Sequence, residues 1–253
     1  MPTHDPYPLP TGALLDRFLD ALAVLRPVAV WAHGSLAGGD YQEGRSDLDL
    51  IAVLPAPVGL GTVRRTVALH RRLRSDPLAA KLHCSYLAPD TLTDPARPHL
   101  TWAYNVTRRP VTPVTRRELH AFGRVLHGAS PAELLPPVPA RQLTDFVVRD
   151  QRDYWRPAVN RARLWRQDIW VDLGLLTLAR ATATLRDGRL ISKREALDLL
   201  PDLGAPGDVV EDITRRRYGP PAPPSTPEWT ARRAELTRGY LGPAIDKLVA
   251  GYR

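Results

Sequence analysis

The sequence predicts an α/β domain, a small mixed sheet with helices, followed by an all-α helical-bundle domain. Short apolar runs of strand length alternate with amphipathic stretches in the first third of the chain. Helical patterns dominate from about residue 140 onward, and the proline-rich segment 136–139 separates the two regions. The expected domains are therefore 1–135 and 140–253.

The sheet of the first domain is predicted from three short runs bounded by turn residues, at 28–31, 47–54 and 82–87. Apolar residues recur at helical spacing in 12–26 and 61–75, so helices are expected there. The order of these five segments is that of an alternating α/β unit.

A proline-rich segment follows, with five prolines between Pro89 and Pro113, and it predicts an irregular connection over the surface. Next, Thr115-Arg-Arg-Glu118 has the pattern of a capping box. It predicts a helix that runs to about His127 and ends at Gly128.

The second domain is predicted to consist of helices. Ser192-Lys-Arg-Glu195 is a second capping box, and Gly188 supplies a helix end. The proline-rich piece from Gly219 to Pro227 separates the last two helices. The expected helices are 141–155, 168–187, 192–200, 207–217 and 227–250.

Composition excludes several classes of protein. No segment approaches the roughly 20 apolar residues of a membrane span, and the N-terminus lacks the pattern of a signal peptide, so a cytoplasmic protein is expected. The lone Cys84 supports neither a disulfide framework nor a structural zinc site. A monomer is favoured.

The formal charge of +8 raises the question of nucleic-acid binding. Lysine occurs only at 81, 193 and 247, so arginine carries nearly all the positive charge in a chain that is also rich in alanine and proline. Such a charge also arises from codon bias. Nucleic acid therefore remains the less favoured partner.

Two carboxylates are the first candidate site residues. Asp47 and Asp49 are two positions apart on a predicted strand, so their side chains leave the same face. Mg²⁺ prefers hard oxygen ligands and is commonly held by one or two carboxylates plus substrate phosphates. The pair alone is equally compatible with two acidic residues at a strand end.

A second candidate is Gly34-Ser35, which follows the first predicted strand. Glycine lets the backbone approach a phosphate, and exposed N–H groups with the serine hydroxyl bind it. Taken alone, an ordinary turn is the commoner explanation. Combined with Asp47-Leu-Asp49 at the start of the next strand, the pattern becomes specific for a nucleotide and a metal.

The stretch HGSLAGGDYQEGRSDLDL resembles the signature of the nucleotidyltransferase superfamily that includes DNA polymerase beta, and looks most like aminoglycoside adenylyltransferases. A weaker similarity to the streptomycin/spectinomycin enzymes extends through 126–139 and 172–218. The resemblance implies a small α/β domain before an all-helical domain, with ATP and the antibiotic bound in the cleft between them.

The resemblance also implies roles for individual residues. Asp47 and Asp49 match the metal ligands, and Gly34, Ser35 and Ser46 match the phosphate-binding groups. In the helical domain, Arg180, Lys193 and Tyr218 fall where the family contacts the nucleotide; packing, surface and helix-start roles remain open for them. The cofactors implied are Mg²⁺ and, as co-substrate, ATP.

One position departs from the family. Its members use a Glu on the third strand as general base, whereas this sequence places His83 there. A histidine with a pKa near about 6.5 can still accept a hydroxyl proton at neutral pH. The alternatives are that the base lies elsewhere or is absent.

Acceptor contacts are predicted from aromatic and acidic residues, because ammonium groups bind to both. Trp165, Asp168 and Asp172 lie just before the family-like helical segment, and Trp102 lies in the proline-rich connection. The alternative for each tryptophan is a place in the core.

The leading hypothesis is Mg²⁺-dependent transfer of AMP from ATP to a hydroxyl of a small cationic acceptor, such as an aminoglycoside, in antibiotic resistance. Two alternatives stay open. One is nucleotidyl transfer to tRNA or protein, and the other is a nucleotide-binding regulatory module that has lost its catalytic base.

Overall fold

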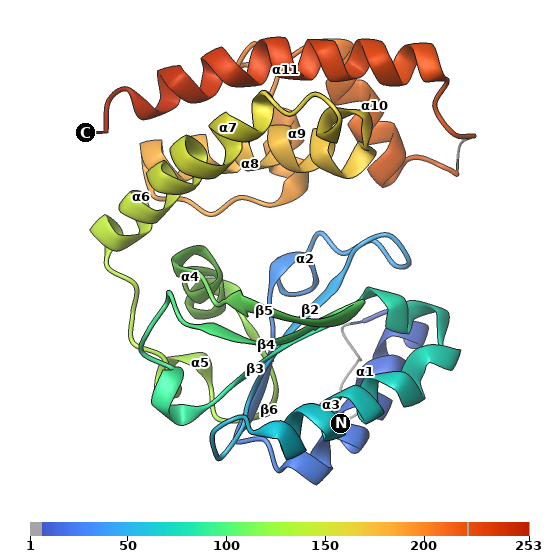
Figure 1. Ribbon diagram of the computed structural model, residues 1–253, viewed down its shortest axis with the longest axis vertical. Helices are drawn as coiled ribbons and strands as arrows, with labels where there is room; N and C mark the ends of the chain where they lie inside the picture. Colours follow the sequence, from blue (N-terminus) through green and yellow to red (C-terminus); the bar gives the residue numbers. More distant parts are fainter. Residues whose placement is uncertain (1–6, 222, 253) are drawn as a thin grey trace, which may run out of the picture. The chain divides into compact units, whose positions relative to one another are not determined.

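The computed structural model describes residues 7–221 and 223–252. Its chain divides into two compact units, Met1–Val138 and Pro139–Arg253. The first unit contains all the strands of the described residues, and the second is built from helices (Figure 1). The predicted fold class, an α/β domain followed by a helical domain, is confirmed.

The first unit is organised around one six-stranded sheet in the order β5-β4-β3-β2-β1-β6. Strands β2 and β3 are parallel, and every other neighbouring pair is antiparallel, so the sheet is mixed as predicted. The strands are β1 Ala29–Ala32, β2 Leu48–Val53, β3 Leu82–Leu87, β4 Pro98–Ala103, β5 Asn105–Pro110 and β6 Arg124–Gly128.

Alternate side chains of the strands enter two separate hydrophobic cores, one on each face of the sheet. Leu50 and Cys84 point to the face covered by α1 (Leu9–Leu22) and α3 (Leu60–Arg72). On the other face, Ile51 packs in a smaller core with residues of α4 (Pro113–Phe122) and of the segment around α5 (Pro131–Leu134). This second face is the one that carries Asp49.

The prediction of an irregular connection between Pro89 and Pro113 is wrong, because this segment contains β4 and β5. The two strands form a hairpin in which Pro98 pairs with Pro110. Proline cannot donate to a ladder and is tolerated at strand ends. These prolines therefore mark the ends of two strands instead of excluding them.

The predicted helix 115–127 is also corrected. Helix α4 begins earlier, with Thr112 as N-cap accepting from the Thr115 amide at 3.2 Å, and ends at Phe122. The segment from Arg124 onward pairs with β1 as the edge strand β6. Pairing with an existing strand decides the conformation of this short, mostly exposed run.

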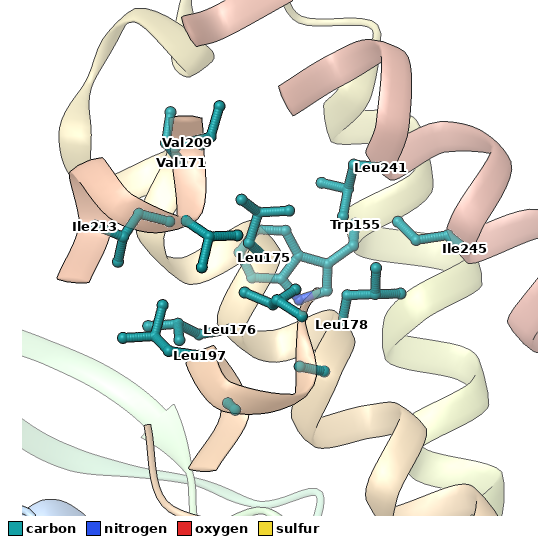
Figure 2. Close-up of a cluster of buried hydrophobic side chains, with 14 of the residues drawn as sticks. Trp155, Val171, Leu175, Leu176, Leu178, Leu197, Val209, Ile213, Leu241 and Ile245 are labelled. Carbon is teal, nitrogen blue, oxygen red and sulfur yellow. The ribbon is translucent and has the colours of Figure 1, made fainter. Parts of the chain in front are cut away.

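The second unit has its own hydrophobic core, in which Trp155, Leu175 and Leu241 are buried (Figure 2). Helix α8 spans the predicted residues, with Gly188 at φ +66° as its C-cap, and the Ser192–Glu195 capping box is present. The helices are α6 Ala140–Arg149, α7 Arg156–Val159, α8 Asp168–Asp187, α9 Lys193–Leu199, α10 Gly207–Tyr218 and α11 Pro227–Val249.

The predicted helix 141–155 differs in one respect, because α6 continues as a π-helical turn, Asp150–Trp155, before α7.

Within the part of the chain that the structure describes, no helix has the length and hydropathy to cross a bilayer.

Candidate active site

The site is positioned by the two parallel strands at the centre of the sheet. Asp49 of β2 lies in register with His83 of β3, so both side chains leave the same face. Asp47 directly precedes β2, and its Oδ2 lies 4.0 Å from His83 Nδ1. His83 Nδ1 is 3.7 Å from Asp49 Oδ1. The sequence-predicted trio is therefore together in space.

The Gly34-Ser35 turn faces the same carboxylates. The His33 amide donates to the Asp49 carbonyl at 3.0 Å, which joins the end of β1 to the start of β2. Gly34 begins the short helix α2 (Gly34–Ala37) at φ +62°, and a Cβ at this position would lie 2.8 Å from Asp49 Oδ2. Only glycine combines this backbone conformation with this close approach.

Ser46 fixes the loop that leads into Asp47. Its side chain is buried, its Oγ accepts from the Gln42 amide at 3.0 Å, and its own amide donates to the Gln42 carbonyl at 2.8 Å. A bond to phosphate would use the remaining hydroxyl hydrogen. The contact of Ser46 with a nucleotide stays a prediction.

The arrangement fits a magnesium ion that is shared with a nucleotide. Asp47 Oδ1 is buried and makes no hydrogen bond, with Lys81 Nζ 3.6 Å away. A buried carboxylate oxygen without a partner is a feature that a bound cation would satisfy. Among the described residues no group of three or more His, Cys, Asp and Glu side chains could hold a metal, and Mg²⁺ bound to one or two carboxylates is commonly completed by substrate phosphates and water.

A cavity of about 170 Å³ opens beside Asp49 and His83, and His33 also lines it. His33 Nδ1 lies 3.6 Å from Oε2 of Glu118, a buried residue of α4. Burial lowers the pKa of His33, but the carboxylates of Glu118 and Asp49 outweigh this effect and raise it above its usual range. The sequence offered one signal for His33, its place before Gly34, and none for Glu118.

Tyr104 is a further residue of this site that sequence reasoning missed. It lies at the turn between β4 and β5, its φ is +62°, and its ring meets the His83 ring edge-on at a centroid distance of 5.0 Å. A tyrosine with positive φ is unusual, and such strain is concentrated at functional sites. More than half of its surface is exposed, which leaves the ring free to contact a second molecule.

Two predicted acceptor contacts are corrected by the structure. Trp102 pairs with Cys84 and therefore points to the sheet face opposite Asp49, where its ring stacks on His70 at 4.5 Å. Trp165 has no exposed surface, and its indole N–H donates to the Ala158 carbonyl at 2.9 Å. Both tryptophans are core residues, because their large apolar rings stabilise more by burial than by exposure.

In the second unit, the predicted nucleotide contacts gather around the start of α9. Lys193 is the first residue of that helix, and Arg180 Nε donates to the carbonyl of Ile191, two residues earlier, at 3.0 Å. The Tyr218 ring lies 3.8 Å from the guanidinium of Arg194, the residue after Lys193. Their contact with a nucleotide stays a prediction.

The two acidic acceptor candidates already have cationic partners. Asp172 binds Arg216 through two hydrogen bonds of 2.9 and 2.6 Å, and Asp168 pairs with the buried Arg233. Burial raises the pKa of Asp172, and the opposing effect of Arg216 does not cancel it. A cationic acceptor would compete with Arg216 at Asp172, whereas the exposed side of Asp168 stays accessible; the contact of either carboxylate with an acceptor stays a prediction.

Comparison with known proteins places this geometry on a known fold. No family model and no curated protein matches the sequence. The structure is similar to the crystal structure of spectinomycin adenyltransferase AAD(9) from Enterococcus faecialis with ATP and spectinomycin, with a TM-score of 0.71 and 15% identity over 92% of this chain and 98% of that chain. This chain therefore shares the fold of AAD(9). The resemblance predicted from the Gly34 to Asp49 motif is thus confirmed at the level of the fold.

Proposed function

We propose that the protein is a Mg²⁺-dependent nucleotidyltransferase that transfers AMP from ATP to a hydroxyl group. The observation that carries the proposal is the approach of the Gly34 backbone to Asp49 Oδ2, with Asp47 beside it. A phosphate-binding turn and a pair of metal-binding carboxylates then face one another. AAD(9), which shares the fold, was crystallised with ATP, and this supports the choice of ATP as the nucleotide.

Asp47 and Asp49 hold the metal in this proposal, and the Gly34-Ser35 turn binds the phosphates through its N–H groups and hydroxyl. When bound, Mg²⁺ supplies neutralisation of the phosphate charge and polarisation of the phosphoryl group. Lys81, 3.6 Å from Asp47, adds a positive charge at the same place. Attack by the acceptor oxygen on the α-phosphorus in line with the leaving pyrophosphate completes the transfer.

His83 takes the proton of the acceptor hydroxyl in this proposal. Its Nδ1 lies 4.0 Å from Asp47 Oδ2 and 3.7 Å from Asp49 Oδ1, so the ring stands directly beside the two carboxylates. Its Nε2 has no hydrogen-bond partner, and the residue lines the cavity beside Asp49.

The acceptor we propose is a small cationic molecule of the aminoglycoside class. AAD(9), which shares the fold, was crystallised with spectinomycin. On this chain, the exposed Tyr104 ring beside His83 offers the aromatic contact with the acceptor that the sequence predicted for Trp102 and Trp165. Transfer to tRNA or protein, and nucleotide binding without transfer, are the alternatives.

The proposal is tested by incubating the protein with Mg²⁺ and each labelled NTP against aminoglycosides, lincosamides and total tRNA. We expect mass spectrometry to find one added AMP on an aminoglycoside, and Asp47→Asn to abolish it because the metal loses a ligand. If tRNA gained the labelled nucleotide and the aminoglycosides did not, the proposed acceptor would be wrong and tRNA would take its place. ATP binding without transfer to any acceptor would identify a regulatory module.

A variant of His83 tests its role as base. His83→Ala should lower turnover by roughly 10²–10⁴-fold, the usual contribution of a general base, while calorimetry shows nearly unchanged ATP affinity. His127→Ala, at an exposed position on β6, is the matched control. Parental turnover in His83→Ala would remove His83 from the mechanism.

A further inference from the structure

A groove of about 530 Å³ lies within the second unit, and none of the candidate site residues named above lines it. Leu178 and Arg186 of α8 form one wall, and Gly239 and Lys247 of α11 form the other. Its volume is in the roughly 300–1,000 Å³ range of small-molecule sites. A groove of this size between two long helices needs an explanation, because neighbouring helices normally close such space with side chains.

The groove is open because α11 lacks side chains where they would fill it. No atom lies within 4 Å of the position that a Cβ would take at Gly239. Pro243, one turn later in the same helix, has no N–H, so the Gly239 carbonyl lacks its helical donor. Glycine and proline both weaken a helix interior, and here the two residues leave space and a carbonyl acceptor together.

The inner walls of the groove are mainly apolar. Leu178, Leu203, Ala244 and Leu248 contribute aliphatic surface to it. The Tyr240 hydroxyl donates to the Leu203 carbonyl at 3.1 Å, which fixes the loop before α10 against α11. A ligand here therefore needs an apolar body.

The charges along the groove select the head group of that ligand. Arg186 and Lys247 are both exposed, come from different helices, and form no ion pair with any described residue. Asp202 is the single acidic residue among those that line the groove, so positive charge prevails. Two unpaired cations at the edge of an apolar groove match one anionic group.

We propose that this groove is a second binding site, which takes a small apolar molecule with one anionic head group. The apolar body lies against Leu178 and Leu248, and the anion pairs with Arg186 and Lys247. This site is independent of the proposed nucleotidyl transfer, since none of its residues takes part in it.

The test uses 8-anilinonaphthalene-1-sulfonate, a fluorescent apolar anion, and its uncharged analogue N-phenyl-1-naphthylamine, with the full-length protein. We expect saturable binding of the sulfonate, lost in Gly239→Leu, which fills the groove and suits a helix better than glycine. Gly207→Leu is the control, because Gly207 also has nothing within 4 Å of an added Cβ and lies outside the groove.

The charge requirement is tested in the double variant Arg186→Gln/Lys247→Gln. Sulfonate binding should be about tenfold weaker there, since an exposed charge pair contributes roughly a factor of three. Arg232→Gln, an exposed position on α11 outside the groove, should bind like the parent. Equal affinity of the uncharged analogue for the parent would contradict the proposed head group.

Hydrogen exchange on the parent protein gives a second test that depends on no variant. Bound sulfonate should slow exchange in 178–186 and 239–248. Unchanged exchange in both segments, or parental sulfonate binding by folded Gly239→Leu, would overturn the site.

Discussion

At the scale of single residues, the candidate active site depends on the space left free at Gly34. Its φ of +62° and the 2.8 Å from an added Cβ to Asp49 Oδ2 are two separate reasons for glycine. The first concerns backbone strain and the second the position of a carboxylate. Another glycine of the same loop region separates the two effects, because Gly39 also has positive φ, +78°, but nothing lies within 4 Å of its added Cβ.

We therefore expect Gly34→Ala and Gly39→Ala each to lower the free energy of unfolding by about 1 kcal/mol, the cost of the left-handed conformation for alanine. Only Gly34→Ala should also displace the Asp49 carboxylate and weaken Mg²⁺-ATP binding more than tenfold. Urea unfolding and calorimetry measure the two quantities. Equal loss of ATP binding in both variants would show that backbone strain, and not the carboxylate, is responsible.

At the scale of secondary-structure elements, patterns that are complete within one segment were predicted well. The turn-bounded run of β3 and the caps of α8 and α9 depend on neighbours in sequence, and these elements appear where predicted. Strand β6 could not be predicted, because its conformation depends on pairing with β1, almost 100 residues earlier. The same reason explains Trp102, whose face of the sheet is set by the unrecognised strand β4.

The packing of α3 on the sheet makes a prediction about pH. His70 is buried there, with Nε2 2.8 Å from the Tyr86 hydroxyl, and burial lowers the pKa of His70 to about 3. The folded protein leaves this ring neutral, whereas the unfolded chain protonates it below its ordinary pKa of 6.5. Stability is therefore lost as the pH falls from 6.5 toward 3.

His70→Gln should remove this dependence and keep a polar partner for Tyr86. Between pH 7 and pH 5 the parent should lose about 2 kcal/mol more free energy of unfolding than the variant, because each pH unit below 6.5 costs about 1.4 kcal/mol. Urea unfolding at both values measures the difference, and His127→Gln controls for an exposed histidine. Parallel curves for parent and His70→Gln would contradict a neutral buried ring.

At the scale of the whole molecule, several arginines serve the interior of the two units. Arg233 is fully buried and binds Asp212 at 2.7 Å, and Arg216 binds Asp172 and Asp212. Arg116 is buried too, and donates to three backbone carbonyls. These arginines stabilise the two units internally and are therefore not available to bind an acceptor.

Each unit also has a hydrophobic core of its own, so we expect residues 139–253 to fold when expressed alone. Circular dichroism should show a helical fragment with a cooperative thermal transition. A fragment without such a transition would mean that the second unit depends on the first for its stability.

The central claim is that Asp47, Asp49 and the Gly34-Ser35 turn form one site for Mg²⁺ and a nucleotide. Calorimetric titration of ATP with and without Mg²⁺ tests it most directly, on the parent, on Asp49→Asn, and on Asp90→Asn as an exposed control. We predict Mg²⁺-dependent ATP binding that the control retains and that Asp49→Asn weakens more than tenfold, because the substitution removes a metal ligand and its charge. ATP affinity that is the same in Asp49→Asn and the parent would contradict the account.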